Sequence, residues 1–197
     1  MPIFIHFSPL VFPLLLLLVP VISTPEKHTM PPKQDLVRTS CVHASYPNIC
    51  LRTLSSYSGL AKTPRDLAQA AVKVSLARAR KASVFLSQLK NPSKREVGAL
   101  NDCIVQMGDS VDELSETLEE LHHLHGGDFQ WRMSNAQTWV SAALTNEDTC
   151  LDGFKEIDGN IRSDVKKKVT NLARITSNAL YLINLLDESR GKRTVRT

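Results

Sequence analysis

The sequence lacks several features that would point to common classes of function. It has no C-x-x-C pair, no apolar/polar alternation of the kind that β-strands show, and only 6% aromatic residues. Widely spaced cysteines argue against a structural zinc site, and the lack of a basic stripe interleaved with aromatics argues against nucleic-acid binding. The closest match to an N-glycosylation sequon, Asn91-Pro92-Ser93, is excluded by its proline. We expect no metal, no cofactor and no nucleic-acid partner.

The amino-terminal end carries a long apolar run. Residues 1–23 contain no Asp, Glu, Lys or Arg and end in small or polar residues, so we interpret them as a secretory signal peptide. Pro13 and Pro20 interrupt the run, which argues against a membrane helix. No later segment is apolar over a bilayer-spanning length, so we expect a secreted chain without membrane association, opening with a flexible segment at 24–34.

Four later segments carry apolar residues at the three-and-four spacing of amphipathic helices. The clearest seam consists of Val97, Leu100, Ile104, Met107, Val111, Leu114, Leu118 and Leu121. The segment before it places on one side Leu67, Ala70, Val74, Ala77 and Val84. The other two segments run from about 128 to 154 and from about 165 to 186.

Capping and breaking residues bound these segments. The Thr-Pro pair at 63–64 is typical of an N-cap followed by the first helical residue, and Ser93 with Glu96 has the spacing of a capping box. Breaks follow at Gly126-Gly127 and at 158–160.

We therefore predict an all-α domain over residues 35–188. It comprises an N-terminal helical hairpin at 35–60 and an up-down four-helix bundle at 63–188. We expect the basic tail, 189–197, to be disordered.

The cysteines, Cys41, Cys50, Cys103 and Cys150, all follow the signal peptide, and an even count in an oxidising compartment predicts two disulfides. The midpoint of Cys103 and Cys150 falls between the two glycines at the predicted turn. These cysteines should therefore face each other across an antiparallel helix pair, within the ~4.4–6.8 Å Cα separation that a disulfide requires. That leaves Cys41 to pair with Cys50 and close the hairpin.

Polar stripes lie opposite the apolar seams of two helices. The third bundle helix carries Ser141, Thr145, Asp148 and Asp152, and the second carries Asp102, Asp109, Asp112, Glu116 and Glu120. Taken alone, such stripes are typical of solvated faces. No catalytic residue is predicted, because a compact bundle leaves little room for a nucleophile, a base and an orienting group in one cleft.

Basic residues are concentrated ahead of the acidic stripe. Nine of them lie between Lys62 and Arg95, where Asp66 is the single acid, and the chain has a formal net charge of +4. A positive excess of this kind favours retention near acidic polysaccharide.

Four stretches together resemble the plant invertase and pectin methylesterase inhibitor family. In order they read CVHASYPNICLRTL, ALNDCIVQMGDSVDEL, TWVSAALTNEDTCLDGF and TSNALYLINLL. Ala44, Val105 and Met107 differ from the residues that the family usually has at these positions. The resemblance implies a four-helix bundle with a helical hairpin, disulfides between the first and second and between the third and fourth cysteines, and secretion to the plant cell wall or apoplast. It also implies a monomeric inhibitor that blocks a carbohydrate-active enzyme one-to-one without covalent chemistry.

The resemblance leaves two target enzymes open. Family members that block pectin methylesterases cover the pectin-binding cleft with bundle helices, whereas invertase inhibitors use a Pro-Lys-Phe motif between the first two bundle helices. Residues 90–95 contain no phenylalanine, which favours pectin methylesterase, with acid invertase as the alternative. The candidate contact residues are Ser141, Thr145, Asp148, Asp152, Asp109, Asp112 and Glu116.

Two other interpretations remain. One is an inhibitor-like pro-region of a pectin methylesterase, which the end of the chain at Thr197 argues against. The other is a wall or signalling module that inhibits nothing.

Overall fold

The computed structural model describes residues 35–194, so the predicted signal peptide at 1–23 and the segment at 24–34 lie outside the described residues. Within them the regular structure is helical. Two short helices, α1 (Leu36–Cys41) and α2 (Pro47–Leu54), precede four long ones: α3 (Pro64–Ser87), α4 (Glu96–His122), α5 (Phe129–Gly153) and α6 (Arg162–Thr194). No described helix is long and apolar enough to cross a membrane.

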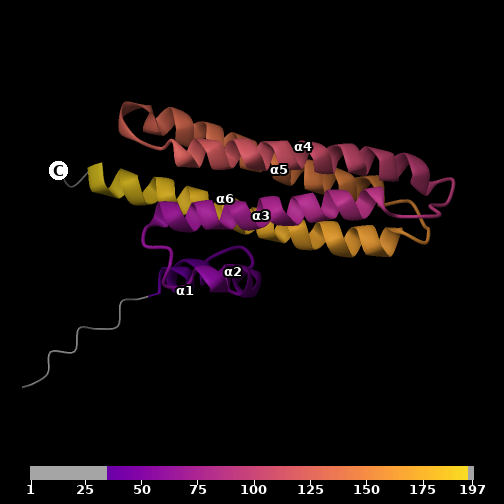
Figure 1. Cartoon of the computed structure of the whole chain (residues 1–197), viewed down its shortest axis with the longest axis horizontal. Coiled ribbons are helices and arrows are strands. Elements are labelled where there is room, and N and C mark those ends of the chain that lie inside the picture. Colours follow the sequence, from indigo (N-terminus) through magenta and orange to yellow (C-terminus); the bar gives the residue numbers. More distant parts are fainter. Residues whose placement is uncertain (1–34, 195–197) are drawn as a thin grey trace, which may run out of the picture. The chain divides into compact units, whose positions relative to one another are not determined.

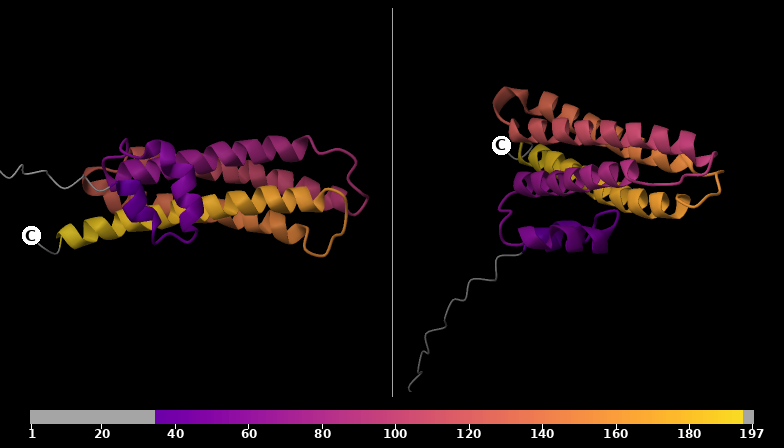
Figure 2. Two further views of the ribbon diagram at one scale, coloured as in Figure 1. Left: turned by 90° about the horizontal axis from the view of Figure 1, so that it is seen from below. Right: turned by 45° about the vertical axis from the view of Figure 1, so that its right-hand side comes forward.

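The four long helices form two layers, α4 with α5 and α3 with α6 (Figure 1). Each long helix packs against two of the others, and α1 and α2 lie on the α3/α6 layer. Figure 2 shows that this hairpin covers one end of that layer and leaves the other end of α3 and α6 open. The predicted four-helix bundle with an N-terminal hairpin is confirmed.

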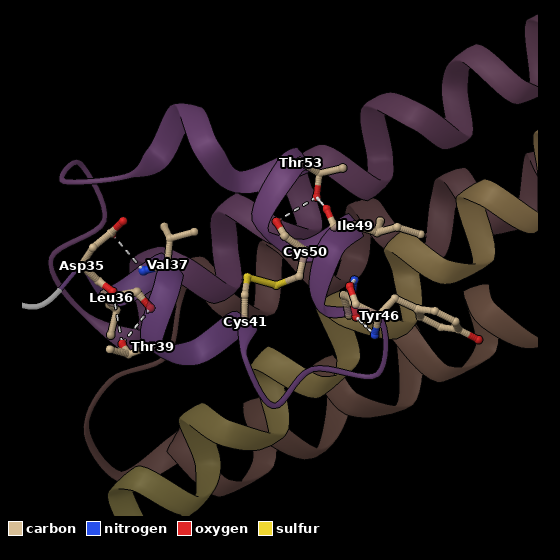
Figure 3. The surroundings of a disulfide bond; sticks show 10 residues. Asp35, Leu36, Val37, Thr39, Cys41, Tyr46, Ile49, Cys50 and Thr53 are labelled. Atoms are coloured by element: carbon tan, nitrogen blue, oxygen red, sulfur yellow. Dashed lines mark hydrogen bonds between the residues drawn. A yellow bond between two sulfur atoms is a disulfide. The ribbon is translucent and has the colours of Figure 1, made fainter.

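A disulfide and an amide side chain hold the hairpin in place (Figure 3). Cys41 and Cys50 join α1 to α2 with a Cα–Cα distance of 5.5 Å. The buried Asn178 of α6 accepts a hydrogen bond from the Tyr46 N–H at 2.9 Å and donates one to the Tyr46 carbonyl at 3.0 Å. Because this amide satisfies both backbone groups of one residue, it ties the turn between α1 and α2 to the bundle.

The start of α3 follows the sequence prediction closely. Thr63 and Asp66 form a reciprocal capping box, and Pro64 is the first helical residue. At α4 the predicted box is only half formed. The Glu96 carboxylate accepts from the Ser93 N–H at 2.9 Å, but the Glu96 N–H donates to the Ser93 carbonyl and not to its hydroxyl.

Glu96 has a second role, because it also caps α6. It is fully buried, and its other oxygen accepts from the N–H groups of Ile161 at 2.9 Å and Arg162 at 3.1 Å. Burial raises the pKa of this carboxyl, but the hydrogen bonds from Ser93, Ile161 and Arg162 outweigh burial and hold the pKa below its usual value. One ionised carboxylate thus satisfies free N–H groups at two helix starts.

The core of α4 agrees largely with the predicted seam. Leu100, Met107, Leu114 and Leu121 are buried at every seventh position, with Cys103, Ser110 and Thr117 buried between them. Ile104, Val111 and Leu118 pack at the edge of the core. The assignment of Val97 to the seam is wrong, because this side chain is 43% exposed.

The predicted face of α3 is wrong in its second half. Leu67 and Ala70 are buried, but Ala77 is exposed and Val84 is 54% exposed. The helix instead buries Ala68, Ala71, Val72, Ser75, Leu76, Ala79, Ala82 and Leu86. Most residues of this buried stripe have small side chains, so its helical periodicity is weak in the sequence. The larger residue Val84 suggests a different buried face, which is wrong.

The expectation of a disordered tail from residue 189 is wrong for residues 189–194, which continue α6. Contacts with α5 persist there, since the guanidinium of Arg190 lies 3.9 Å from the centre of the Phe129 ring. Residues 195–197 lie outside the described part of the chain.

Gly159 gives a direct test of the Glu96 cap, because a Cβ added there would overlap the Glu96 carboxylate. Gly159→Ala should lower the free energy of unfolding by about 1–3 kcal/mol, the usual cost of overpacking. Gly108→Ala, within α4 and facing open space, is the matched control and should raise it by about 0.5–1 kcal/mol. Urea denaturation measures both values, and equal stability of the two variants would contradict the proposed contact.

Candidate functional site

The candidate site lies on the antiparallel pair formed by α4 and α5. Cys103 and Cys150 are bonded, with a Cα–Cα distance of 4.4 Å, which is the pairing that the Gly126-Gly127 turn predicts. Small residues also face each other here, since a Cβ on Gly153 would lie 3.9 Å from that of Ala99. All four cysteines of the chain are in disulfides, so none is available as a nucleophile.

A groove of about 390 Å³ opens beside this disulfide. Its walls include Asp102, Val105 and Gln106 from α4 with Thr149 and Asp152 from α5. The structure therefore brings one acid from each predicted stripe to the same groove. Val105 is 59% exposed between them, so the groove offers two carboxylates around an apolar patch.

The other candidate residues lie on the outer surfaces of the same two helices. Ser141, Thr145 and Asp148 are exposed on α5. Exposed on α4 are Asp109, Asp112 and Glu116. In the described part of the chain none of these four carboxylates forms an ion pair, whereas Asp152 contacts Lys155 at 3.4 Å. The face is acidic, and most of its charges are open to a partner.

Two further acids on this side connect the helices. Glu120 accepts hydrogen bonds from Arg132 at 3.1 Å and Asn135 at 3.0 Å, so its assignment to the solvent-facing stripe is wrong. Glu113 accepts from Asn146 at 2.8 Å, and burial raises its pKa despite this hydrogen bond. The antiparallel turn at Gly126-Gly127 places these residues at similar heights, as it does the cysteines, so the signal that pairs Cys103 with Cys150 also predicts these polar pairs.

The residues that depart from the family pattern divide between core and surface. Ala44 and Met107 are buried, so these two departures affect the packing of the core. Val105 lies in the groove, so a departure at this position changes the candidate contact surface itself.

A buried acid lies beneath this face. Glu147 is fully buried, and its Oε1 accepts hydrogen bonds from the hydroxyls of Ser110 at 3.0 Å and Thr176 at 2.9 Å. Burial raises its pKa to about 8, although the two hydrogen bonds act in the opposite direction. Buried acids with shifted pKa values often mark active sites, but this one does not line the groove and instead joins α4, α5 and α6.

Neither the two tryptophans nor the histidines near the end of α4 extend this site. Trp131 is 72% exposed and Trp139 is 38% exposed, so neither is a core residue. The His123 ring contacts Glu119 at 3.2 Å and lies edge-on to His125. Across residues 35–194 no three potential ligands among His, Cys, Asp and Glu converge on a metal position.

Comparison with known proteins agrees with this architecture. Residues 35–182 match the family model for plant invertase/pectin methylesterase inhibitors. The chain is 56% identical over 169 residues to pectinesterase inhibitor 3 of Arabidopsis thaliana, covering 81% of this chain and 82% of that protein. It is 42% identical over 169 residues to pectinesterase inhibitor 9 of the same plant, covering 80% and 83%.

A solved structure shows the same fold. The crystal structure of mutant form A of a pectin methylesterase inhibitor from Arabidopsis superposes with a TM-score of 0.64 at 24% identity. The match covers 77% of this chain and 97% of that one.

The shifted pKa of Glu147 makes stability depend on pH. The folded state holds the proton up to about pH 8, whereas the unfolded chain releases it near 4.5, so the contribution of Glu147 to stability is greatest below about 4.5 and falls as pH rises towards 8. In that window this group contributes a slope of up to about −1.4 kcal/mol per pH unit. Glu147→Gln, which keeps the side-chain shape without the charge, should be more stable than the wild type at pH 8 and lose the advantage near pH 4.

Urea titrations of both proteins from pH 4 to pH 8 measure this difference. Because Glu113 and Glu96 titrate in both proteins, only the difference between them reports on Glu147. A difference that does not change with pH would contradict the assignment.

Proposed function

Because this chain belongs to the plant invertase/pectin methylesterase inhibitor family, we propose that it is a secreted inhibitor of pectin methylesterase. It forms a non-covalent, one-to-one complex that covers the substrate cleft of the enzyme, and it acts in the cell wall space on the extent of pectin methylesterification. The observation that carries this proposal is the 56% identity, over four-fifths of the chain, to a relative named as a pectinesterase inhibitor. The chain is an inhibitor and has no catalytic role of its own.

The α4/α5 face is the surface that docks on the enzyme. The hairpin packs on α3 and α6, so it leaves this face uncovered. An enzyme that handles galacturonan has a cleft suited to an acidic polymer, and the carboxylates of Asp102, Asp148 and Asp152 present charge of the same sign. Such electrostatic complementarity raises the association rate and favours one orientation of the complex.

The face is also rigid before binding. The disulfide between Cys103 and Cys150 and the hydrogen bonds of Glu113 and Glu120 hold α4 and α5 in register. Little conformational entropy is then lost on association, which favours tight binding.

The target is tested by titrating purified protein against pectin methylesterase and acid invertase in parallel. We expect pectin methylesterase activity to fall to its minimum at one equivalent of inhibitor while invertase is unaffected. Inhibition of invertase alone would favour the alternative target, and inhibition of neither enzyme would contradict the proposal.

Charge reversal tests the docking face. Asp148→Lys with Asp152→Lys should raise the inhibition constant for pectin methylesterase by about 10-fold or more, because charges at an interface strongly affect association. The matched control is Asp164→Lys with Glu188→Lys, which makes the same charge change at exposed positions of α6, in the other layer of the bundle. Thermal unfolding of both double variants checks the fold, and unchanged inhibition by a folded Asp148/Asp152 variant would exclude this surface.

A further inference from the structure

A second groove, of about 710 Å³, lies between α3 and α6 in the layer opposite the docking face. Its polar lining is mostly cationic: Arg78 and Lys81 come from α3, and Lys166, Lys167, Lys168 and Arg174 come from α6. The only acid in the lining is Asp164. The proposed inhibition does not use this groove.

These cations are not neutralised within the protein. In the described residues Arg78, Lys81 and Lys167 form no ion pair or side-chain hydrogen bond. Lys168 lies 4.8 Å from the centre of the Phe85 ring and Arg174 lies 5.5 Å from that of Tyr46, and these contacts leave the positive charge in place. Several like charges in one concave surface produce a positive potential that attracts anions.

The cations form a strip, because they follow two antiparallel helices. A neighbouring hollow of about 310 Å³, lined by Arg80, Lys81, Val84, Phe85 and Gln88, continues the groove along α3. An elongated strip with charges on both sides fits a linear polyanion better than a single small anion.

The uncharged lining favours a sugar polymer. Thr170 and Asn171 offer hydroxyl and amide groups for hydrogen bonds with the hydroxyls of a sugar polymer. The groove has no open aromatic platform for stacking nucleobases, since Lys168 covers the Phe85 ring.

We propose that this α3/α6 groove binds polygalacturonate, the de-esterified and carboxylate-bearing form of pectin. The choice of galacturonate as the acidic sugar rests on the proposed function, because a pectin methylesterase releases this carboxylate. Since the groove and the docking face lie on opposite layers, the protein binds the polymer and the enzyme at the same time. The protein is therefore retained where de-esterified pectin accumulates.

Binding of polygalacturonate oligomers to the purified protein, measured by titration calorimetry at low salt, tests the groove. The variant Arg78→Gln, Lys81→Gln, Lys167→Gln should bind about 10-fold or more weakly, and binding by the wild type should weaken as salt screens the charges. The matched control, Lys73→Gln, Lys90→Gln, Lys94→Gln, removes the same charge from exposed positions outside the groove and should bind like the wild type.

Other ligands identify the occupant. Fully methylesterified oligomers should not bind, because they lack the carboxylates. Equal affinity for polyglutamate, single-stranded DNA or anionic vesicles would overturn polygalacturonate as the ligand, and equal loss of binding in the two triple variants would overturn the groove as the site. All mutated positions are exposed, and the single variants Lys81→Gln and Lys167→Gln replace the triple variant if its thermal unfolding is altered.

A polymer-free measurement separates this inference from the inhibitor proposal. Association of the protein with immobilised pectin methylesterase should be the same for the wild type and the groove variant. Wild-type protein that binds the oligomers but not the enzyme would contradict only the inhibitor proposal. Wild-type protein that binds the enzyme but not the oligomers would contradict only the groove.

Discussion

The close antiparallel contact between α4 and α5 is the constraint on which both the core and the candidate surface depend. The disulfide between Cys103 and Cys150 fixes the axial register of the two helices. Gly153 lies beside Ala99, and the small size of both residues allows the helices to pack closely. With this register, Glu147 meets Ser110 inside the bundle, while acids of both helices meet at the outer groove. A shift of one helix by a single turn would separate the groove residues and leave the buried carboxyl without its hydroxyl partner on α4.

The two layers of the bundle carry opposite charge, and the distance between their outer faces is large enough for salt to screen one face from the other. Helices are about 10 Å wide, so outer faces on opposite layers are separated by more than the Debye length of about 8 Å at physiological ionic strength. The acidic α4/α5 face and the basic α3/α6 groove therefore act on their surroundings almost independently. The net charge of +4 does not reveal this arrangement, since it sums an acidic face and a basic face.

The sequence predicts features that depend on residues close together in the chain, and it misses features that depend on contacts between distant segments. The Gly126-Gly127 turn was enough to pair Cys103 with Cys150, and strong periodicity was enough for the buried residues of α4. The prediction of the buried face of α3 was wrong because alanines make up most of that face, and alanines give a weak periodic signal. The second role of Glu96 could not be predicted from the local sequence, because its partners at the start of α6, Ile161 and Arg162, lie 65 and 66 residues away. Helical phase predicts which acids face outward, but it does not predict the groove between Asp102 and Asp152, because this groove depends on how α4 and α5 pack.

The contributions of the two fully buried glutamates to stability depend on pH in opposite directions. The carboxyl of Glu96 has a lowered pKa, so its contribution is present above about 4.5 and is lost only as pH falls through that lowered value. Glu147, with a pKa raised to about 8, behaves oppositely and loses its contribution as pH rises from about 4.5 towards 8. Near pH 4.5 the first is ionised and caps two helices, while the second is neutral and avoids a buried charge. Neither extreme of pH satisfies both groups, so their combined contribution to stability is largest near pH 4.5.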